Sequence, residues 1–151
     1  EIVIRGPTVM RGYWEMPEAT AEAMRGGWFH SGDVGYADED GFIYIIDRKK
    51  DLIISGAINV SPKEVEEVIY THPAVFECAV IGTPDPEWGE AVTAVVALKA
   101  GATATEEEII AYCRERLAGY KKPRRVFFVD EIPRNPSGKV LKRVLREQFG
   151  R

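Results

Sequence analysis

Lys139 ends a loop whose last residues are Pro-Ser-Gly, a composition that predicts an exposed cationic side chain just before a helix. The Gly-Lys pair suggests a phosphate loop, but that loop needs a Gly five residues before its second Gly and a Ser or Thr after the Lys. Pro133 and Val140 stand at those positions, so the spacing excludes a phosphate loop of this type. On pattern alone, a solvated lysine is the simplest interpretation of Lys139.

Two other features could bind an anionic or aromatic ligand. Lys121, Lys122, Arg124 and Arg125 place four cations within six residues of a chain whose net charge is −4. They could form a local anion site, or they could stabilise the end of a preceding helix. Trp88 lies in a Pro-flanked segment, where its ring could be a packed anchor or a platform on which a base stacks.

Asp33 follows a Ser-Gly pair, and its two carboxylate oxygens could accept hydrogen bonds from a diol or cap a turn. No metal site is expected, because His30 and His72 are isolated from other potential ligands. Cys78 and Cys113 are not part of a CxxC pair. We therefore expect two buried reduced thiols and neither a disulfide nor a zinc site.

The composition excludes several classes of protein. With 151 residues, 45% of them hydrophobic, the chain can bury a core, and its pI near 5.3 argues against general binding to nucleic acid or anionic membranes. The longest apolar runs, such as residues 91–98, are too short for a transmembrane segment, and we expect a cytoplasmic protein. Since Glu1 opens the chain inside an apparent strand, we also expect a piece of a longer polypeptide.

A charged segment, residues 47–62, divides the chain into two parts of different character. Its first residues are Asp-Arg-Lys-Lys-Asp, and they join two apolar segments, residues 42–46 and 52–54. The pattern alone favours an ordinary hairpin turn between two strands, although hinges can have the same composition. A glycine-rich, strand-rich part precedes this segment, and alternating helices and strands follow it.

From Asp51 onward the pattern predicts strand, strand, helix, strand, strand, helix, strand and helix, which is typical of a small α+β domain with helices on a sheet. Capping boxes at Ser61 with Glu64 and at Thr105 with Glu108 mark two helix starts. The predicted elements are a helix to about His72, strands at 75–82 and 92–99 around a loop at 83–90, a helix ending at Gly119, a strand at 126–129 and a last amphipathic helix with Val140, Val144, Leu145 and Phe149.

Together these features resemble one family, the adenylate-forming acyl-CoA synthetases, to which luciferases and peptide-synthetase adenylation domains are related. The motifs occur in the family's order along the whole chain. They are Gly-Pro-Thr-Val-Met-Arg-Gly-Tyr at 6–13, Gly-Trp-Phe-His-Ser-Gly-Asp at 27–33, Asp-Arg-Lys-Lys-Asp at 47–51 and Pro-Arg-Asn-Pro-Ser-Gly-Lys at 133–139.

The resemblance implies activation of a carboxylic acid with MgATP to an acyl-adenylate and pyrophosphate, followed by acyl transfer to a thiol. Asp33 would then bind the ribose hydroxyls of ATP, and Arg48 would contact the ribose and phosphate side. Lys139 would meet the carboxylate and the α-phosphate during adenylation. Lys50 would be the hinge at which the small domain rotates between the two reactions, exchanging Lys139 for the Gly56 side.

For the coenzyme A ligases of this family, the resemblance also implies a thiol site. Gly56 would let pantetheine pass close to the backbone, and Trp88 would stack on the adenine of coenzyme A. Its phosphates would pair with Lys121, Lys122 or Arg124. The sequence departs from many coenzyme A ligases at Ala57, where they have a second glycine, so one methyl group is a small obstacle in the expected thiol channel.

By the same resemblance, residues 1–49 are the end of a large N-terminal AMP-binding domain and residues 50–151 are its C-terminal lid domain. The ATP loop and acyl pocket would lie upstream, where most of the contacts to ATP and Mg would also be made, so the isolated chain is predicted to be inactive. We expect a ligase for a fatty or aromatic acid. The open alternatives are a carrier-protein acceptor, a non-catalytic interaction module and luciferase-like oxidation.

Overall fold

The structure is a computed structural model that describes residues 1–150 and divides into two compact units, Glu1–Lys50 and Asp51–Arg151. We call them the N-terminal unit and the C-terminal unit, and each is described by itself. In the described part of the chain, no helix has both the length and the apolar character needed to cross a membrane.

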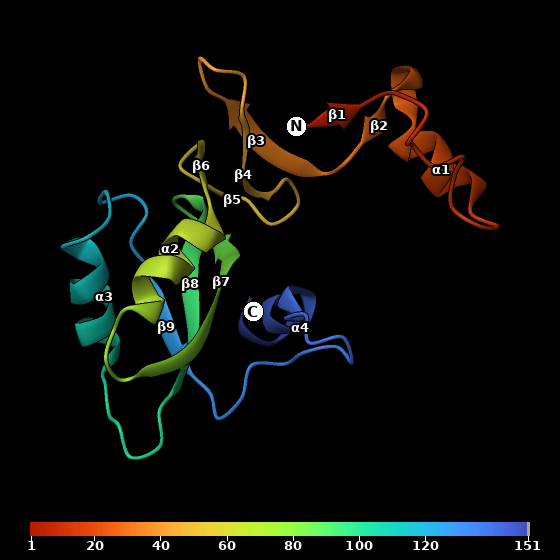
Figure 1. Ribbon diagram of the computed structural model, residues 1–151. Helices are drawn as coiled ribbons and strands as arrows, with labels where there is room; N and C mark the ends of the chain where they lie inside the picture. The colour runs from red at the N-terminus through yellow and green to blue at the C-terminus, as the bar shows by residue number, and fades with distance from the viewer. Residues whose placement is uncertain (151) are drawn as a thin grey trace. The chain divides into compact units, whose positions relative to one another are not determined.

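The N-terminal unit is made of short elements (Figure 1). They are β1 (Val3–Ile4), α1 (Pro17–Ala23), a 3-10 helix (Arg25–Gly27), β2 (Phe29–His30), β3 (Asp33–Ala37) and β4 (Ile43–Arg48). β1 pairs antiparallel with β2, and β3 pairs antiparallel with β4. Residues 1–50 are all described and none of them is fully buried. Isolated two-stranded sheets are at best marginally stable in water, and these two have no buried core of their own.

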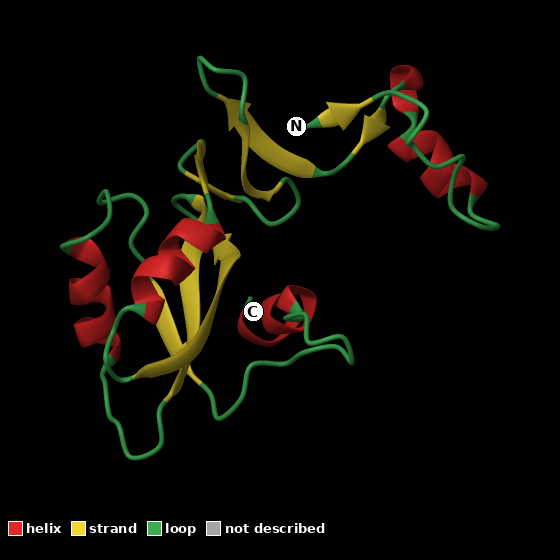
Figure 2. Ribbon diagram, viewed as in Figure 1, coloured by secondary structure: helices red, strands yellow, loops and turns green. Residues whose placement is uncertain are grey.

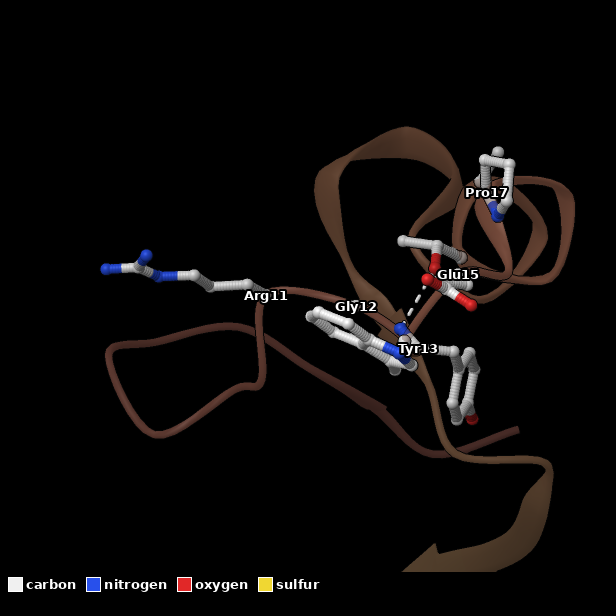
Figure 3. Close-up of a pocket in the computed structure, with 8 residues that line it drawn as sticks. Arg11, Gly12, Tyr13, Glu15 and Pro17 are labelled. Carbon is white, nitrogen blue, oxygen red and sulfur yellow. Dashed lines mark hydrogen bonds between the residues drawn. The ribbon is translucent and has the colours of Figure 1, made fainter.

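One hollow of the N-terminal unit, of about 620 Å³, is lined by residues of the segment that leads into α1 (Figure 3). The Thr20 hydroxyl organises this segment, since it accepts a hydrogen bond from the Tyr13 N–H (2.9 Å) and donates one to the Met16 carbonyl (2.8 Å). A Cβ at Gly12 would lie 2.6 Å from the Thr20 methyl group, so any larger residue would displace the Thr20 side chain. The hollow is lined by none of the predicted site residues.

The C-terminal unit has one mixed five-stranded sheet with helices on both faces (Figures 1 and 2). Its elements are β5 (Ile53–Ser55), β6 (Ile58–Val60), α2 (Pro62–Tyr70), β7 (Val75–Asp85), β8 (Gly89–Leu98), α3 (Glu106–Arg114), β9 (Arg125–Phe128) and α4 (Lys142–Phe149). The order along the sheet is β6-β5-β8-β7, and β9 pairs parallel with β8.

The sheet separates two apolar cores because successive strand residues point to opposite faces. Cys78 and Val80 of β7 pack with α2 and α3, in a core that also holds Ile69 and Ile109. Ala79 and Ile81 of the same strand pack on the other face, where Ile132 and Leu145 complete the second core. The second core therefore fixes α4 and the segment before it, which contains Lys139.

The predicted order of elements after Asp51 is confirmed, and so is the small α+β architecture. The capping box of α3 is also confirmed, since Thr105 and Glu108 exchange both of its hydrogen bonds. The Ser61 hydroxyl accepts from the Glu64 N–H at the start of α2 (3.4 Å), as expected of its N-cap.

Several predictions about element boundaries and strand pairing are wrong. The expected loop at 83–90 is mostly strand, because β7 extends to Asp85 and β8 begins at Gly89, which leaves a short turn. The helix expected to end at Gly119 ends at Arg114. The hairpin interpretation of the charged segment is also wrong, since β4 pairs with β3 whereas β5 pairs with β6 and β8.

Candidate functional site

Lys139 lies in an exposed loop between β9 and α4, and hydrogen bonds within this loop hold its backbone together. The Asn135 N–H donates to the Lys139 carbonyl (2.9 Å), and the Lys139 N–H donates to the Asn135 side-chain oxygen (2.8 Å). The same oxygen accepts from the Ser137 hydroxyl (2.8 Å), and Arg134 forms a β-bridge with Val140. Among residues 1–150, Lys139 Nζ has no hydrogen bond or ion pair, so its charge is available to a ligand.

The two-residue turn between β5 and β6 consists of Gly56 and Ala57, because Ser55 pairs directly with Ile58. Both turn residues have positive φ, 58° and 63°, as in the type I′ turns that favour tight hairpins. Gly56 tolerates this conformation, whereas Ala57 is strained by its Cβ. A second glycine would therefore suit position 57, which is the residue where the sequence departs from the family pattern.

Trp88 packs directly against this turn. A Cβ at Gly56 would lie 2.6 Å from Cε3 of the Trp88 ring, and the Gly56 N–H donates to the Trp88 carbonyl (2.9 Å). The Arg124 guanidinium carbon lies 4.3 Å from the centre of the Trp88 ring, within the range of a cation–π contact. An adenine could stack on that part of the ring only if Arg124 moved. The Trp88 Nε1–H is buried without a hydrogen-bond partner in the described chain.

Asp85 holds the turn that carries Trp88, because one of its carboxylate oxygens accepts from the N–H groups of Glu87 and Trp88, each at 3.0 Å. These hydrogen bonds, above all that from Trp88, lower the pKa of Asp85, and the charges of Arg125 and Arg124 act in the same direction. The carboxylate is therefore the form that stabilises the turn.

The basic cluster does not present all its charges to solvent. Lys121 Nζ donates to both carboxylate oxygens of Glu64, at 2.6 and 2.7 Å, and this contact raises the pKa of Lys121. Glu64 had been expected to serve the capping box of α2, but its carboxylate binds Lys121. Lys122 forms no ion pair within the part of the chain that the structure describes. Lys122 and Arg124 are thus the more available cations of the predicted phosphate site.

In the N-terminal unit, Asp33 and Arg48 are paired across β3 and β4. Arg48 Nε lies 2.7 Å from Asp33 Oδ1, and the two residues are direct partners in the strand register. Arg48 and Lys50 also line a cavity of about 410 Å³, together with Arg25, Lys49, Gly32, Glu1 and Glu22. Four cationic side chains and two carboxylates line this cavity, so its excess positive charge suits an anionic ligand.

Two carboxylates that stabilise these loops were not identified from the sequence. Glu90 of β8 accepts a hydrogen bond from the Ile54 N–H (2.7 Å), next to the Gly56 turn. Glu77 of β7 accepts from the Ile132 N–H (3.1 Å) and from Arg134 (2.6 Å), at the base of the Lys139 loop. Each contact spans more than thirty residues, so no local signal predicts it.

Residues 64–139 match the family described as the AMP-binding enzyme C-terminal domain. The chain belongs to this family. The resemblance found in the sequence motifs is thereby confirmed, since this family is the C-terminal domain of the adenylate-forming superfamily.

Several curated relatives of this chain are named as CoA ligases or CoA synthases. The chain is 56% identical over 146 residues to a 2-succinylbenzoate–CoA ligase of Geobacillus kaustophilus, covering 97% of the chain and 30% of that relative. It is 54% identical over 150 residues to a feruloyl-CoA synthase of Amycolatopsis sp, covering 99% and 30%. A long-chain-fatty-acid–CoA ligase of Bacillus subtilis is 52% identical over 148 residues, covering 98% and 26%. The chain thus spans about three tenths of the length of these relatives.

Solved structures agree with the fold. ATP-bound MatB from Rhodopseudomonas palustris superposes with a TM-score of 0.89 at 47% identity, over 98% of this chain and 30% of that one. The o-succinylbenzoate CoA synthetase MenE from Bacillus subtilis, in complex with its acyl-adenylate, gives a TM-score of 0.89 at 43% identity, over 97% and 30%. The predicted class, a small α+β C-terminal domain, is confirmed.

Proposed function

We propose that this AMP-binding enzyme C-terminal domain is part of an AMP-forming acid–CoA ligase. The full-length protein would convert an acid and ATP to an acyl-adenylate and pyrophosphate, and then transfer the acyl group to coenzyme A with release of AMP. The observation that carries the proposal is the identity of 56% and 54%, over nearly the whole chain, with two relatives that are named a CoA ligase and a CoA synthase.

In the proposed reaction, Lys139 stabilises the negative charge that develops as the acid attacks the α-phosphate. Its exposed ammonium group is free within the described chain and sits on a closed loop, so it can enter an active site built mainly by another domain. A unit charge about 4 Å from another is worth roughly 4 kcal/mol at an effective dielectric near 20. Fixed cations of this kind are a principal source of catalysis in phosphoryl chemistry.

Asp33 and Arg48 are proposed to bind the nucleotide from the N-terminal unit. Asp33 would accept hydrogen bonds from the ribose hydroxyls, while Arg48, already 2.7 Å from it, would face the ribose and phosphate side. Mg would arrive with ATP, held mainly by the upstream domain. Among the described residues no group of three His, Cys, Asp or Glu could hold a metal ion.

The thiol site is proposed at the Gly56 turn, where pantetheine would pass the backbone. Trp88 would stack on the adenine after displacing Arg124, which would then be free to pair with a phosphate alongside Lys122. Lys121 would contribute only by exchanging Glu64 for a phosphate. The turn and Trp88 are in direct contact, so the passage for pantetheine and the adenine platform would be adjacent.

The two units fit the proposed division into the end of an AMP-binding domain, residues 1–49, and a lid domain, residues 50–151. The exposed apolar side chains of β4, such as Ile43 (63% exposed) and Ile45 (59%), would be covered by the rest of the large domain. Lys50 would be the hinge between the units. Because the ATP loop and the acyl pocket would lie upstream, the isolated chain should not adenylate an acid.

The test is consumption of the coenzyme A thiol by the full-length protein with MgATP and a panel of fatty and aromatic acids. Acid-dependent thiol loss supports the proposal and identifies the acid class. We expect Trp88→Ala to raise the KM for coenzyme A, with Trp14→Ala, an exposed tryptophan of the N-terminal unit, as the matched control. If adenylate forms but free coenzyme A is not consumed, the acceptor is a carrier protein. We also propose that the full-length protein is cytoplasmic.

A further inference from the structure

The Arg134 side chain links the loop of Lys139 to the sheet. One of its terminal nitrogens donates to the Gly138 carbonyl (2.8 Å), directly before Lys139, and the other donates to Glu77 Oε2 (2.6 Å). The planar guanidinium therefore bridges the far end of the loop and a strand of the core. A lysine could make only one of these contacts with comparable geometry.

Glu77 is the fixed end of this bridge. It lies on β7, its side chain is only 13% exposed, and its second oxygen accepts from the Ile132 N–H (3.1 Å) at the base of the loop. Ile132 itself is fully buried in the second core. One carboxylate thus holds both the base and, through Arg134, the tip of the Lys139 loop.

A second ion pair fixes the other side of the loop. Lys142, the first residue of α4, lies 2.8 Å from Glu66 of α2, and both side chains are 18% exposed. The same oxygen of Glu66 accepts from the Val80 N–H (2.8 Å). Lys139 therefore lies between two anchored cations, although its own side chain has no partner among residues 1–150.

We propose that Glu77 is a positioning residue for Lys139, acting through Arg134. This inference rests on the proposed function, because it assumes that Lys139 acts in adenylation. Reactive groups must be placed within a fraction of an ångström, and a displacement of about 1 Å can cost about a hundredfold in rate. We expect Glu77 not to affect the thioester step, because in the proposed function that step uses the Gly56 side of the domain.

The experiment uses the full-length protein and measures the two half-reactions separately. Adenylation is measured as acid-dependent exchange of pyrophosphate into ATP, and acyl transfer as thioester formation from supplied acyl-adenylate and coenzyme A. The variants are Glu77→Gln, Arg134→Lys and Lys139→Ala. Glu147→Gln, which breaks an exposed ion pair with Arg143 on α4, is the control.

We expect Glu77→Gln and Arg134→Lys each to slow exchange about tenfold or more and to leave acyl transfer within about twofold. Trypsin should also cleave the loop faster after Lys139 in Glu77→Gln than in Glu147→Gln, since the loop loses its ion pair with β7. If Glu77→Gln does not fold, Arg134→Lys, whose side chain is 40% exposed, provides the same test.

Exchange within about twofold of wild type in Glu77→Gln would overturn the inference, as would an equal loss of both half-reactions. These outcomes differ from failure of the proposed function. If Lys139→Ala itself leaves exchange unchanged, Lys139 is not the adenylation lysine, and the proposed function fails with the inference. If Lys139→Ala abolishes exchange while Glu77→Gln does not, only the inference fails.

Discussion

Gly56→Ala should be one of the most damaging single-methyl changes in the C-terminal unit. The residue has φ of 58°, so a Cβ costs about 1–2 kcal/mol in the left-handed region. The new Cβ would also lie 2.6 Å from Cε3 and 2.9 Å from Cζ3 of the Trp88 ring, which is too close for any packed atom. Overpacking of this kind costs about 1–3 kcal/mol, so we expect a total loss of about 2–5 kcal/mol.

Ala57→Gly is the matched control in the same turn, and the opposite sign is expected. Ala57 has φ of 63°, and relief of its strain exceeds the greater freedom of glycine in the unfolded chain. We expect a gain of about 0.5–1 kcal/mol. The assay is urea unfolding of the 151-residue chain, followed by circular dichroism. A change of less than about 0.5 kcal/mol for Gly56→Ala would refute the contact between the turn and Trp88.

Three further predictions concern single side chains. Glu90→Ala should cost about 0.5–1.5 kcal/mol in urea unfolding, because the exposed Ile54 N–H exchanges its acceptor for water. It should also slow acyl transfer more than pyrophosphate exchange, and an equal effect on both half-reactions would count against it. Asp85→Asn should weaken the acid sensitivity of folding. The lowered pKa of Asp85 means that its stabilisation is present above the unfolded pKa, near 4, and is lost as pH falls through the folded value. Unfolding curves with the same pH slope below pH 4 in both proteins would disprove this. Burial raises the pKa of Cys78 and raises that of Cys113 to about 11, so a thiol reagent should modify both only in urea, and fast labelling of the folded chain would contradict their burial.

Local patterns were sufficient to predict the order of elements in the C-terminal unit. The capping box of Thr105 and Glu108 joins residues that are three positions apart, so the sequence pattern predicts it directly. Cys113, which was expected to be a buried thiol, likewise lies on the buried face of α3. The lengths of helices and strands could not be predicted as well, because β7 and β8 continue through polar residues that are typical of loops.

The contacts that position the candidate site could not be predicted in the same way. Glu64 has the spacing of a capping residue, yet its carboxylate binds Lys121, which is 57 residues away. Glu77 with Arg134 is another pair separated by 57 residues. Such pairs depend on strand order and on how α4 packs on the sheet. The charged segment at 47–51 is similar, since only the pairing of β4 with β3 distinguishes it from a hairpin turn.

The central claim is that this C-terminal domain supplies Lys139 to the adenylation step of an acid–CoA ligase. The most direct test is to compare pyrophosphate exchange in the full-length protein and its Lys139→Ala variant, using the acid that supports coenzyme A consumption. We predict that exchange falls about a thousandfold, as expected for loss of roughly 4 kcal/mol, while thioester formation from supplied acyl-adenylate persists. Unchanged exchange in Lys139→Ala would contradict the account.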